Sequence, residues 1–186
     1  MTDTVTVRRL SAAEAAEHID ALADVLIDCV EGGASVSFMQ PMTRTKAIAF
    51  WRKVADGVAC GERALLVAQD HERRIVGTVQ LVLVLTENQP HRADVAKLLV
   101  HRRARKQGVA ERLMSAVDAT ARDEGKTVLV LDTVTGGDAG RLYPRVGWQR
   151  VGDIPNYALM PDGRLCGTTI FFKAIAADSS GPRASP

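Results

Sequence analysis

The first third of the chain combines one strand pattern with two helical patterns. Residues 5–10 alternate between apolar and polar side chains and predict a strand. Ser11 follows, and Glu14 comes three residues later, which is the spacing of a capping box at a helix start. Apolar residues then recur at helical spacing as far as Gly32-Gly33, and a second apolar stripe predicts a helix over residues 43–59.

The middle of the chain predicts a β-hairpin and then a strand, a helix and a strand. Two β-rich segments are separated by the polar turn 69–74. Residues 127–132 are almost continuously apolar, as expected of a strand that is covered on both faces and runs parallel to its neighbour. An amphipathic helix precedes this strand, so the unit should be a right-handed βαβ crossover. The predicted elements are strands over 64–68, 75–85, 92–100 and 127–132, and a helix over 109–124.

The last third predicts a short helix and two closing strands. The helix covers residues 139–146, and Pro144 limits its length. Strands over 149–152 and 166–173 flank a loop that contains Pro161-Asp162-Gly163, a composition suited to a tight turn.

Chain length and composition predict one domain. The 186 residues, of which 46% are hydrophobic, are enough for one good core and leave little for a second. Residues 176–186 are dominated by small, polar and proline residues that cannot build a core. We therefore expect a domain over residues 1–175 and a disordered tail over 176–186.

Charge and cysteine content narrow the range of partners. The formal net charge is +2 and acidic and basic residues are interleaved, so no basic face for nucleic acid is evident. Cys29, Cys60 and Cys166 lie far apart, which favours free thiols and no metal site. No apolar leader opens the chain, and the longest apolar run, 79–85, is too short for a bilayer. We expect a cytoplasmic protein without nucleic-acid or membrane partners. Whether the protein forms a homodimer is left open by the sequence.

One segment carries the pattern of an anion site. Gly108 stands where a strand and a basic loop open directly onto the helix that starts at Val109. The free N–H groups of a helix start can hold a pyrophosphate, and a residue without Cβ lets a phosphate approach closely. Gly108 could equally be a simple loop residue, with Arg105 and Lys106 as solvated charges. The local spacing alone does not separate these two interpretations.

The surrounding motifs resemble those of the Gcn5-related N-acetyltransferase (GNAT) family. Residues 105–110, Arg-Lys-Gln-Gly-Val-Ala, resemble the family's acetyl-CoA signature, and residues 141–148 resemble its second signature, a short helix that ends in an aromatic pair and a Gly-aromatic step. This chain departs from the second signature, because Leu142 replaces the first aromatic residue and Pro144 is unusual. The resemblance implies an α/β (α+β) GNAT fold, with a central, mixed, twisted sheet of about six to seven strands flanked by about four helices.

Further pieces resemble the tabtoxin-resistance group, acetyltransferases that disarm a β-lactam toxin. The pieces extend over most of the chain up to Lys173. They are Gly32 to Val36 with Phe38-Met39, Leu131-Asp132-Thr133, Val151-Gly152, Pro161 to Leu165 and Phe172-Lys173. The resemblance bears on fold more than on the acceptor, because similar pockets accept different compounds.

The GNAT resemblance implies a binding mode for acetyl-CoA. Backbone amides near the end of the strand 92–100 would polarise the thioester carbonyl, and amides of residues 107–111 would bind the pyrophosphate. Arg105 belongs to the same signature. The implied contacts are Leu99, Val100, Arg105, Gln107, Gly108, Val109, Ala110 and Glu111. Acetyl-CoA is thus the expected cosubstrate, and no metal is expected.

Three residues are the candidates for acid and base catalysis. Tyr143 occupies the place where relatives hydrogen-bond or protonate the coenzyme sulfur, although a buried tyrosine can also serve packing alone. Asp94 and Asp132 are acids at or within apolar strands, where desolvation raises the pKa of a carboxylate. Either could be the base or bind the ammonium group of the substrate. Alternatively, Asp94 pairs with Arg92 or Lys97, and Asp132 caps a strand end.

The acceptor site is expected between residues 33–39 and residues 157–165. Ser35, Phe38 and Tyr157 could line a small polar cleft, or Phe38 could be a core plug. The histidines near the central strand, His91 and His101, are expected to be solvated.

The resulting prediction is an acetyltransferase that works by direct transfer in a ternary complex. Its acceptor would be the amine or hydroxyl of a small molecule, such as an amino-acid-like toxin or antibiotic. The absence of an acidic run argues against a peptide or protein N-acetyltransferase. A non-catalytic acyl-CoA-binding module is the third possibility, and it would not need Asp94, Asp132 or Tyr143.

Overall fold

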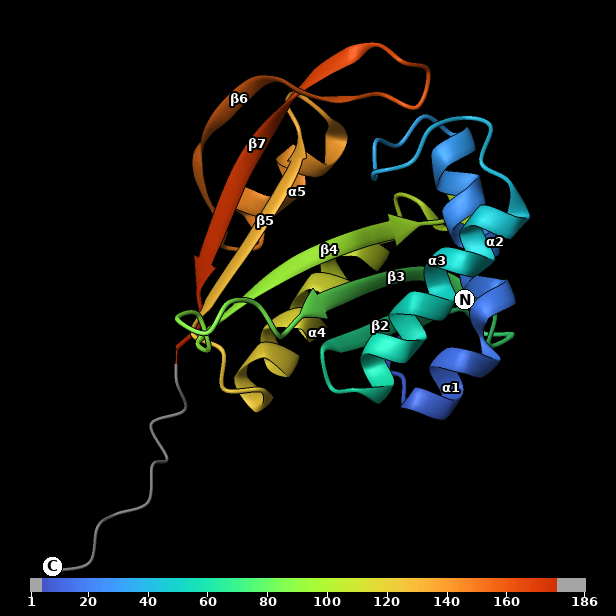
Figure 1. Ribbon diagram of the computed structural model, residues 1–186, viewed down its shortest axis with the longest axis horizontal. Helices are drawn as coiled ribbons and strands as arrows, with labels where there is room; N and C mark the ends of the chain where they lie inside the picture. The colour runs from blue at the N-terminus through green and yellow to red at the C-terminus, as the bar shows by residue number, and fades with distance from the viewer. Residues whose placement is uncertain (1–4, 177–186) are drawn as a thin grey trace, which may run out of the picture.

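Seven strands form one sheet in residues 5–176, the part of the chain that this computed structural model describes (Figure 1). The strand order is β1-β2-β3-β4-β5-β7-β6. All neighbouring pairs are antiparallel except β4 and β5, which run parallel. The mixed α/β fold expected from the sequence is therefore confirmed, with five α-helices in the described residues. Residues 177–186, nearly all of the predicted tail, lie outside them.

The N-terminal elements follow their predicted patterns with one division. The strand β1 spans Thr6–Arg9, and Ser11 and Glu14 form the expected capping box. The single helix expected after Ser11 is split at His18, whose backbone is not helical. The resulting helices are α1 (Ala12–Glu17) and α2 (Ile19–Glu31), and they are followed by α3 (Arg44–Ala59), whose N-cap is Thr43.

The middle elements lie close to their predicted bounds. The hairpin consists of β2 (Arg63–Gln69) and β3 (Ile75–Val82). The next strand, β4, spans Arg92–Val100, and a short 3-10 helix, η1 (Arg102–Ala104), follows it. After η1 come α4 (Val109–Asp123) and β5 (Val128–Val134).

The prediction that β5 is covered on both faces is wrong. Leu129 and Leu131 are buried, whereas Val130 between them is half-buried and Asp132 is exposed. The reason lies in the neighbours of β5. Its parallel pairing with β4 ends after three residue pairs, and its other neighbour, β7, runs antiparallel.

The C-terminal elements are α5 (Asp138–Arg145), β6 (Gln149–Leu159) and β7 (Leu165–Ala174). The predicted strand 149–152 was too short, and Tyr157 lies in β6 and not in a loop. The strand β6 is at the sheet edge, pairs on one side only and is exposed along nearly its whole length. A strand with so little burial lacks the alternation of apolar and polar residues by which strands are recognised.

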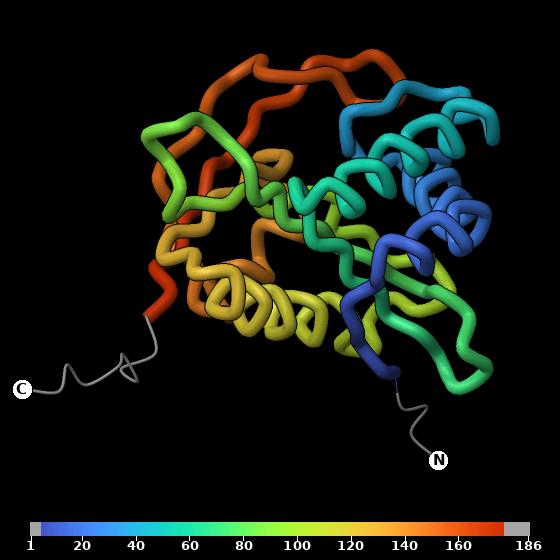
Figure 2. The backbone as a smooth tube through the Cα atoms, turned by 60° about the horizontal axis from the view of Figure 1, so that its bottom comes forward, coloured from blue at the N-terminus to red at the C-terminus, as the bar shows by residue number. Residues whose placement is uncertain are grey.

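Helices cover the sheet on two sides and create two cores. On one face α4 packs its apolar stripe, including Leu113 and Val117, against residues such as Leu81. On the other face α1, α2 and α3 bury Leu26, Trp51 and their neighbours against β2 and β3. Figure 2 shows the helices on opposite sides of the strands.

The sheet opens between β4 and β5. Parallel pairs join Arg92 to Val128, Ala93 to Leu129 and Asp94 to Val130, and no pair follows. From there the two strands diverge, as the V between them in Figure 1 shows. On its other side β4 carries a β-bulge, because two residues, Lys97 and Leu98, oppose one residue of β3. The second half of β4 thus has one edge without a neighbouring strand.

Two leucine-to-alanine substitutions should show that the core beneath α4 contributes more to the free energy of unfolding than the exposed edge of the sheet does. Leu113→Ala should lower the free energy of unfolding by about 2–5 kcal/mol, because Leu113 is fully buried and a cavity would remain. Leu165→Ala is the matched control, since Leu165 is 63% exposed, and its effect should stay within about 0.5 kcal/mol. Urea unfolding measures both, and equal effects would contradict the packing of α4 on the sheet.

Candidate active site

A large cleft occupies the opening between β4 and β5. It has a volume of about 1180 Å³ and collects residues from distant parts of the sequence. Its walls are the second half of β4, the start of α4, the end of β5, the start of α5, the α2–α3 loop and the facing ends of β6 and β7. Such a volume is sufficient for an extended ligand together with a second, smaller one.

The start of α4 points at this cleft as an open anion site. Gly108 is the N-cap, has a φ of +74° and offers no side-chain cap to the first turn. A Cβ at Gly108 would meet no protein atom within 4 Å, so the space in front of the helix is free. Val109 is almost fully buried, and it lines the cleft together with Gly108, Ala110 and Glu111. The first-turn N–H groups therefore remain available to an anion.

The side chains around this helix start are partly engaged in the loop itself. Arg105 donates from Nε to the Val100 carbonyl (3.2 Å), and Gln107 donates from Nε2 to the Arg103 carbonyl (3.1 Å). Glu111 is paired with Arg145, 3.0 Å away. Of the predicted contacts in residues 105–111, the backbone groups are thus the free ones, with Arg105 and Lys106 adding positive charge at the cleft.

The end of β4 forms the inner edge of the cleft. Leu99 and Val100 line it, as the sequence predicted, and β3 pairs with them only on the far side. The Val100 carbonyl accepts hydrogen bonds from Arg105 and from the buried Cys29 Sγ (3.5 Å). The divergence of β5 leaves backbone groups of β4 facing the cleft, where an extended ligand could pair with them as a strand would.

Tyr143 lies on α5 at the opposite wall. Its ring packs against Phe171 and Trp148, with centroids 5.3 and 6.0 Å away, and only 5% of the residue is exposed. Burial, together with the negative charge of Asp132, raises the pKa of Tyr143 to about 12. The hydroxyl therefore keeps its proton at neutral pH. Both predicted roles, packing and a proton donor at the cleft, are compatible with this placement.

Of the two predicted acids, Asp132 lines the cleft and Asp94 does not. Asp132 ends the buried part of β5, and its Oδ2 accepts a hydrogen bond from Thr168 Oγ1 (3.0 Å). Asp94 lies earlier on β4, paired with Arg92 at 3.2 Å, which is one of the alternatives weighed for it. Burial raises the pKa of Asp94, the Arg92 guanidinium opposes this shift, and Asp132 adds to it.

The two segments predicted to form the acceptor site are joined to each other. Ser35 Oγ donates to the Leu159 carbonyl (3.0 Å), and the backbone N–H of Gln40 donates to the Pro161 carbonyl (3.0 Å). In both Figure 1 and Figure 2 the α2–α3 loop and the β6–β7 connection lie side by side. These contacts bridge the end of the cleft where the acceptor is expected.

The predicted acceptor residues have different environments. Ser35, Phe38 and Tyr157 all line the cleft. Phe38 also packs edge-on against Phe50 of α3 with centroids 5.2 Å apart, so it is a core contact as well. Tyr157 is 57% exposed.

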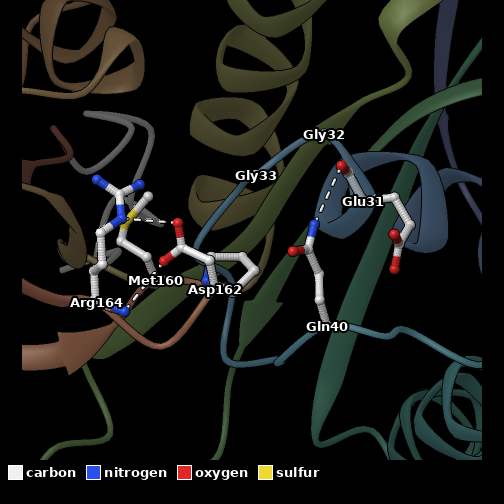
Figure 3. A pocket seen from close by; sticks show the side chains of 8 residues that line it. Glu31, Gly32, Gly33, Gln40, Met160, Asp162 and Arg164 are labelled. Atoms are coloured by element: carbon white, nitrogen blue, oxygen red, sulfur yellow. Dashed lines mark hydrogen bonds and ion pairs between the residues drawn. The ribbon is translucent and has the colours of Figure 1, made fainter.

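A second, smaller pocket lies beside this bridge, and several of its polar side chains are engaged in contacts within the protein (Figure 3). It measures about 280 Å³. Gln40 Nε2 donates to the carbonyls of Val30 and Glu31 at the end of α2, and Asp162 accepts from Arg164 Nε (2.8 Å). These side chains therefore stabilise each segment separately, and the backbone hydrogen bond from Gln40 to Pro161 joins the two.

Lys97 is the cleft residue that sequence reasoning missed. The sequence suggests Lys97 only as an ion-pair partner of Asp94, but among the described residues Asp94 pairs with Arg92 and forms no salt bridge with Lys97. Instead, Lys97 Nζ donates to Ser37 Oγ (3.0 Å) and lies over the rings of Phe38 and Phe50 at 5.9 and 5.8 Å. A lone lysine in the apolar half of a strand was the available signal.

Residues 5–176 contain neither a metal-binding cluster nor a membrane-spanning helix. In that range no three His, Cys, Asp or Glu side chains gather in a way that could hold a metal ion. Within the same range none of the helices combines the length and the apolar character needed to cross a membrane.

Comparison with known proteins shows that this chain is similar to acetyltransferases. The model of the acetyltransferase (GNAT) domain family matches residues 61–150, which include β4, α4 and α5. An uncharacterized N-acetyltransferase of Azospirillum brasilense is 34% identical over 134 residues, which cover 71% of this chain and 76% of that protein.

Solved structures share the whole fold at low sequence identity. A proposed acetyltransferase of Salmonella typhimurium, solved with its cofactor acetyl-CoA, is 15% identical with a TM-score of 0.75, covering 97% of this chain and 99% of that one. The ribosomal-protein-alanine N-acetyltransferase of Brucella melitensis is 19% identical with a TM-score of 0.76, covering 91% and 99%. The TM-scores establish a common fold, and at identities this low the similarity shows the fold alone.

The placement of Tyr143 predicts a late titration. In a Tyr157→Phe background Tyr143 is the remaining tyrosine of the chain, and its tyrosinate absorbance should rise around pH 12, against about 10 for free tyrosine. Adding Asp132→Asn should lower this pKa, because a negative charge disappears, but burial should keep it above that of free tyrosine. Circular dichroism at each pH verifies folding, and titration near 10 in the folded protein would contradict the burial of the hydroxyl.

Proposed function

Since this chain belongs to the acetyltransferase (GNAT) family, we propose that its cleft transfers the acetyl group of acetyl-CoA to an amine or hydroxyl of a small molecule. The observation that supports this most directly is the juxtaposition, in one cleft, of an open helix start, an unpaired strand edge, a carboxylate and a protonated tyrosine. Each of these features matches one requirement of thioester chemistry.

The residues on the donor side fit acetyl-CoA. The free amides of α4 suit the pyrophosphate, and the absence of a Cβ at Gly108 lets it approach the backbone. Arg105, Lys106 and Arg145 surround this end with positive charge. The unpaired edge of β4 suits the amide groups of the pantetheine arm, and amides near Leu99 and Val100 are available to polarise the thioester carbonyl.

Asp132 is the base that we assign. Its carboxylate lies in the cleft and is oriented by Thr168, whereas Asp94 lies outside the cleft lining and is engaged by Arg92. Asp132 would take the proton that the acceptor amine or hydroxyl gives up as it attacks the acetyl carbonyl. Acetyl-CoA supplies the activated acyl group, so no covalent enzyme intermediate is needed.

Tyr143 is the acid that we assign. Its hydroxyl holds a proton at neutral pH and lines the cleft from α5. As the carbon–sulfur bond breaks, Tyr143 would donate this proton to the departing coenzyme A thiolate, and solvent would restore it afterwards. If the sulfur is protonated as the bond breaks, coenzyme A departs as a neutral thiol, which is a better leaving group than the thiolate.

The bridged loops favour a small acceptor over a peptide. Hydrogen bonds from Ser35 to Leu159 and from the Gln40 backbone N–H to Pro161 tie the α2–α3 loop to the end of β6 and to the residues after it, and such a bridge suits a small acceptor. The pieces that resemble the tabtoxin-resistance group, Gly32 to Met39 and Pro161 to Leu165, form these same two segments. We therefore propose an amino-acid-like toxin or antibiotic as the acceptor class.

A panel assay tests this function. Purified protein with acetyl-CoA is offered amino-acid-like compounds, aminoglycosides, polyamines and basic peptides, while released thiol is recorded and acetyl-CoA binding is measured by calorimetry. Thiol release and an acetylated small amine or hydroxyl compound are expected. Transfer to peptides alone would favour a protein N-acetyltransferase, and binding without transfer to any acceptor would favour an acyl-CoA-binding module.

Glycines at the two ends of α4 provide a test of the pyrophosphate site. Gly108→Ala and Gly125→Ala should each cost about 1 kcal/mol of stability, since both residues have positive φ and open surroundings. Only Gly108→Ala should weaken acetyl-CoA binding, by at least about tenfold or 1.4 kcal/mol, because its Cβ enters the anion site. Calorimetric titration measures the difference. Equal affinity in the two variants would place the pyrophosphate elsewhere.

Matched carboxamide variants distinguish the two acids. Asp132→Asn should lower kcat by about 100-fold to 10,000-fold, the usual contribution of a general base, while acetyl-CoA affinity is retained. Asp94→Asn should have a much smaller effect, because Asp94 acts on the cleft only through its charge. Steady-state kinetics decides. A larger loss in Asp94→Asn than in Asp132→Asn would reverse the assignment.

A further inference from the structure

Lys97 is held in an unusual position by the backbone of β4. It belongs to the β-bulge and has a φ of +54°, which lies in the left-handed region that residues other than glycine seldom adopt. This conformation turns its side chain across the cleft, toward Ser37 of the α2–α3 loop. A positive φ is strained for a lysine, and such a conformation persists where the surrounding structure fixes it. The direction of the Lys97 side chain is therefore set by its surroundings.

The ammonium group of Lys97 has unused hydrogen-bonding capacity. It carries three donors, and among the described residues Ser37 Oγ is the one acceptor that it contacts within hydrogen-bond distance. No carboxylate lies within 4 Å of it in that part of the chain. The rings of Phe38 and Phe50 stabilise a cation but accept no conventional hydrogen bond.

Other lysines with restricted exposure show the contrast. Lys173 Nζ contacts Asp118 and the Val146 carbonyl, each at 2.6 Å. Lys126 Nζ contacts the carbonyls of Leu83 and Pro90, each at 2.8 Å. Each of these two lysines uses two of its donors within the protein, whereas Lys97 uses one. Burial lowers the pKa of Lys97, and the positive Arg63 does so too, while Asp132 opposes the shift. An anion beside Lys97 would offset the cost of keeping it charged.

We propose that Lys97 and Ser37 form an anion subsite of the acceptor site, which selects amines that also carry a carboxylate or a similar small oxyanion. This subsite rests on the proposed acetyl transfer to a small molecule and specifies the acceptor class. Asp132 and Lys97 both line the cleft, with opposite charges. A zwitterionic acceptor would place its amine toward Asp132 and its anionic group toward Lys97, so that both ends are paired.

Matched acceptors test the subsite directly. Thiol release is measured for a series of α-, β- and γ-amino acids, for their carboxamides and for the corresponding aminophosphonates, at saturating acetyl-CoA. The wild-type protein should prefer the anionic acceptors over the neutral carboxamides by at least tenfold in kcat/KM, mainly through KM. The aminophosphonate arm separates a carboxylate-specific subsite from one that accepts oxyanions in general.

Variants assign that preference to Lys97. Lys97→Met should lower kcat/KM for the anionic acceptors by at least tenfold more than for the carboxamides, and Lys97→Arg should restore part of the preference. Ser37→Ala, which leaves the aromatic contacts of Lys97 intact, should reduce the same preference by a smaller factor. Lys53→Met is the control for lost charge, because Lys53 is exposed on α3, and it should behave as wild type.

The outcomes separate the subsite from the reaction. Equal transfer to acids and carboxamides, or a preference that survives Lys97→Met, would overturn the subsite while acetyl transfer stands. A loss of kcat in Lys97→Met that is equal for both series would make Lys97 a base and also overturn the subsite. Acetyl-CoA binding without transfer to any member of the series would overturn the small amino-acid acceptor and the subsite together.

Discussion

The early separation of β4 from β5 is the constraint on which the rest of this structure depends. Parallel strands normally pair along their full length, and here they pair over only three residues before diverging. The divergence leaves polar backbone groups of β4 without a strand partner and opens a cleft of about 1180 Å³ at the centre of the molecule. Unpaired backbone groups are costly unless water or a ligand satisfies them, so the cleft is suited to a ligand that can replace the missing strand. The two cores around α4 and around α1 to α3 keep the diverging strands in place.

Charged groups of both signs line the cleft. Positive groups and the helix dipole gather at the start of α4, where the pyrophosphate is expected, and Asp132 is the acid on the opposite strand. Asp132 affects three other groups, because its negative charge adds to the raised pKa values of Asp94 and Tyr143 and opposes the lowering of the Lys97 pKa by burial. Under the proposed function, one carboxylate therefore accepts the proton of the acceptor and helps to keep Tyr143 protonated. The same charge supports the ammonium form of Lys97 in partly buried surroundings.

The acceptor end is shaped by contacts between segments that are far apart in sequence. Ser35 and Leu159 are separated by 124 positions, yet their hydrogen bond joins the α2–α3 loop to the edge of the sheet. Phe38 contributes to this end in two ways, since it packs on Phe50 and also forms part of the setting of Lys97. Packing and recognition thus share the same side chains, which explains why a core plug and an acceptor contact are not exclusive alternatives for Phe38.

The sequence by itself determined most of the elements and the position of Gly108 at a helix start. Hydrophobic periodicity and capping residues are local signals, and they located β4, α3 and α4 closely, with Gly108 as the N-cap of α4. The length of β6, the one-sided burial of β5 and the choice between Asp94 and Asp132 depended on tertiary structure. They follow from which strands pair and where β4 and β5 part, and no local pattern encodes that. Lys97 remained hidden for the same reason, because its direction is set by a bulge and its surroundings by a loop that begins more than sixty positions earlier.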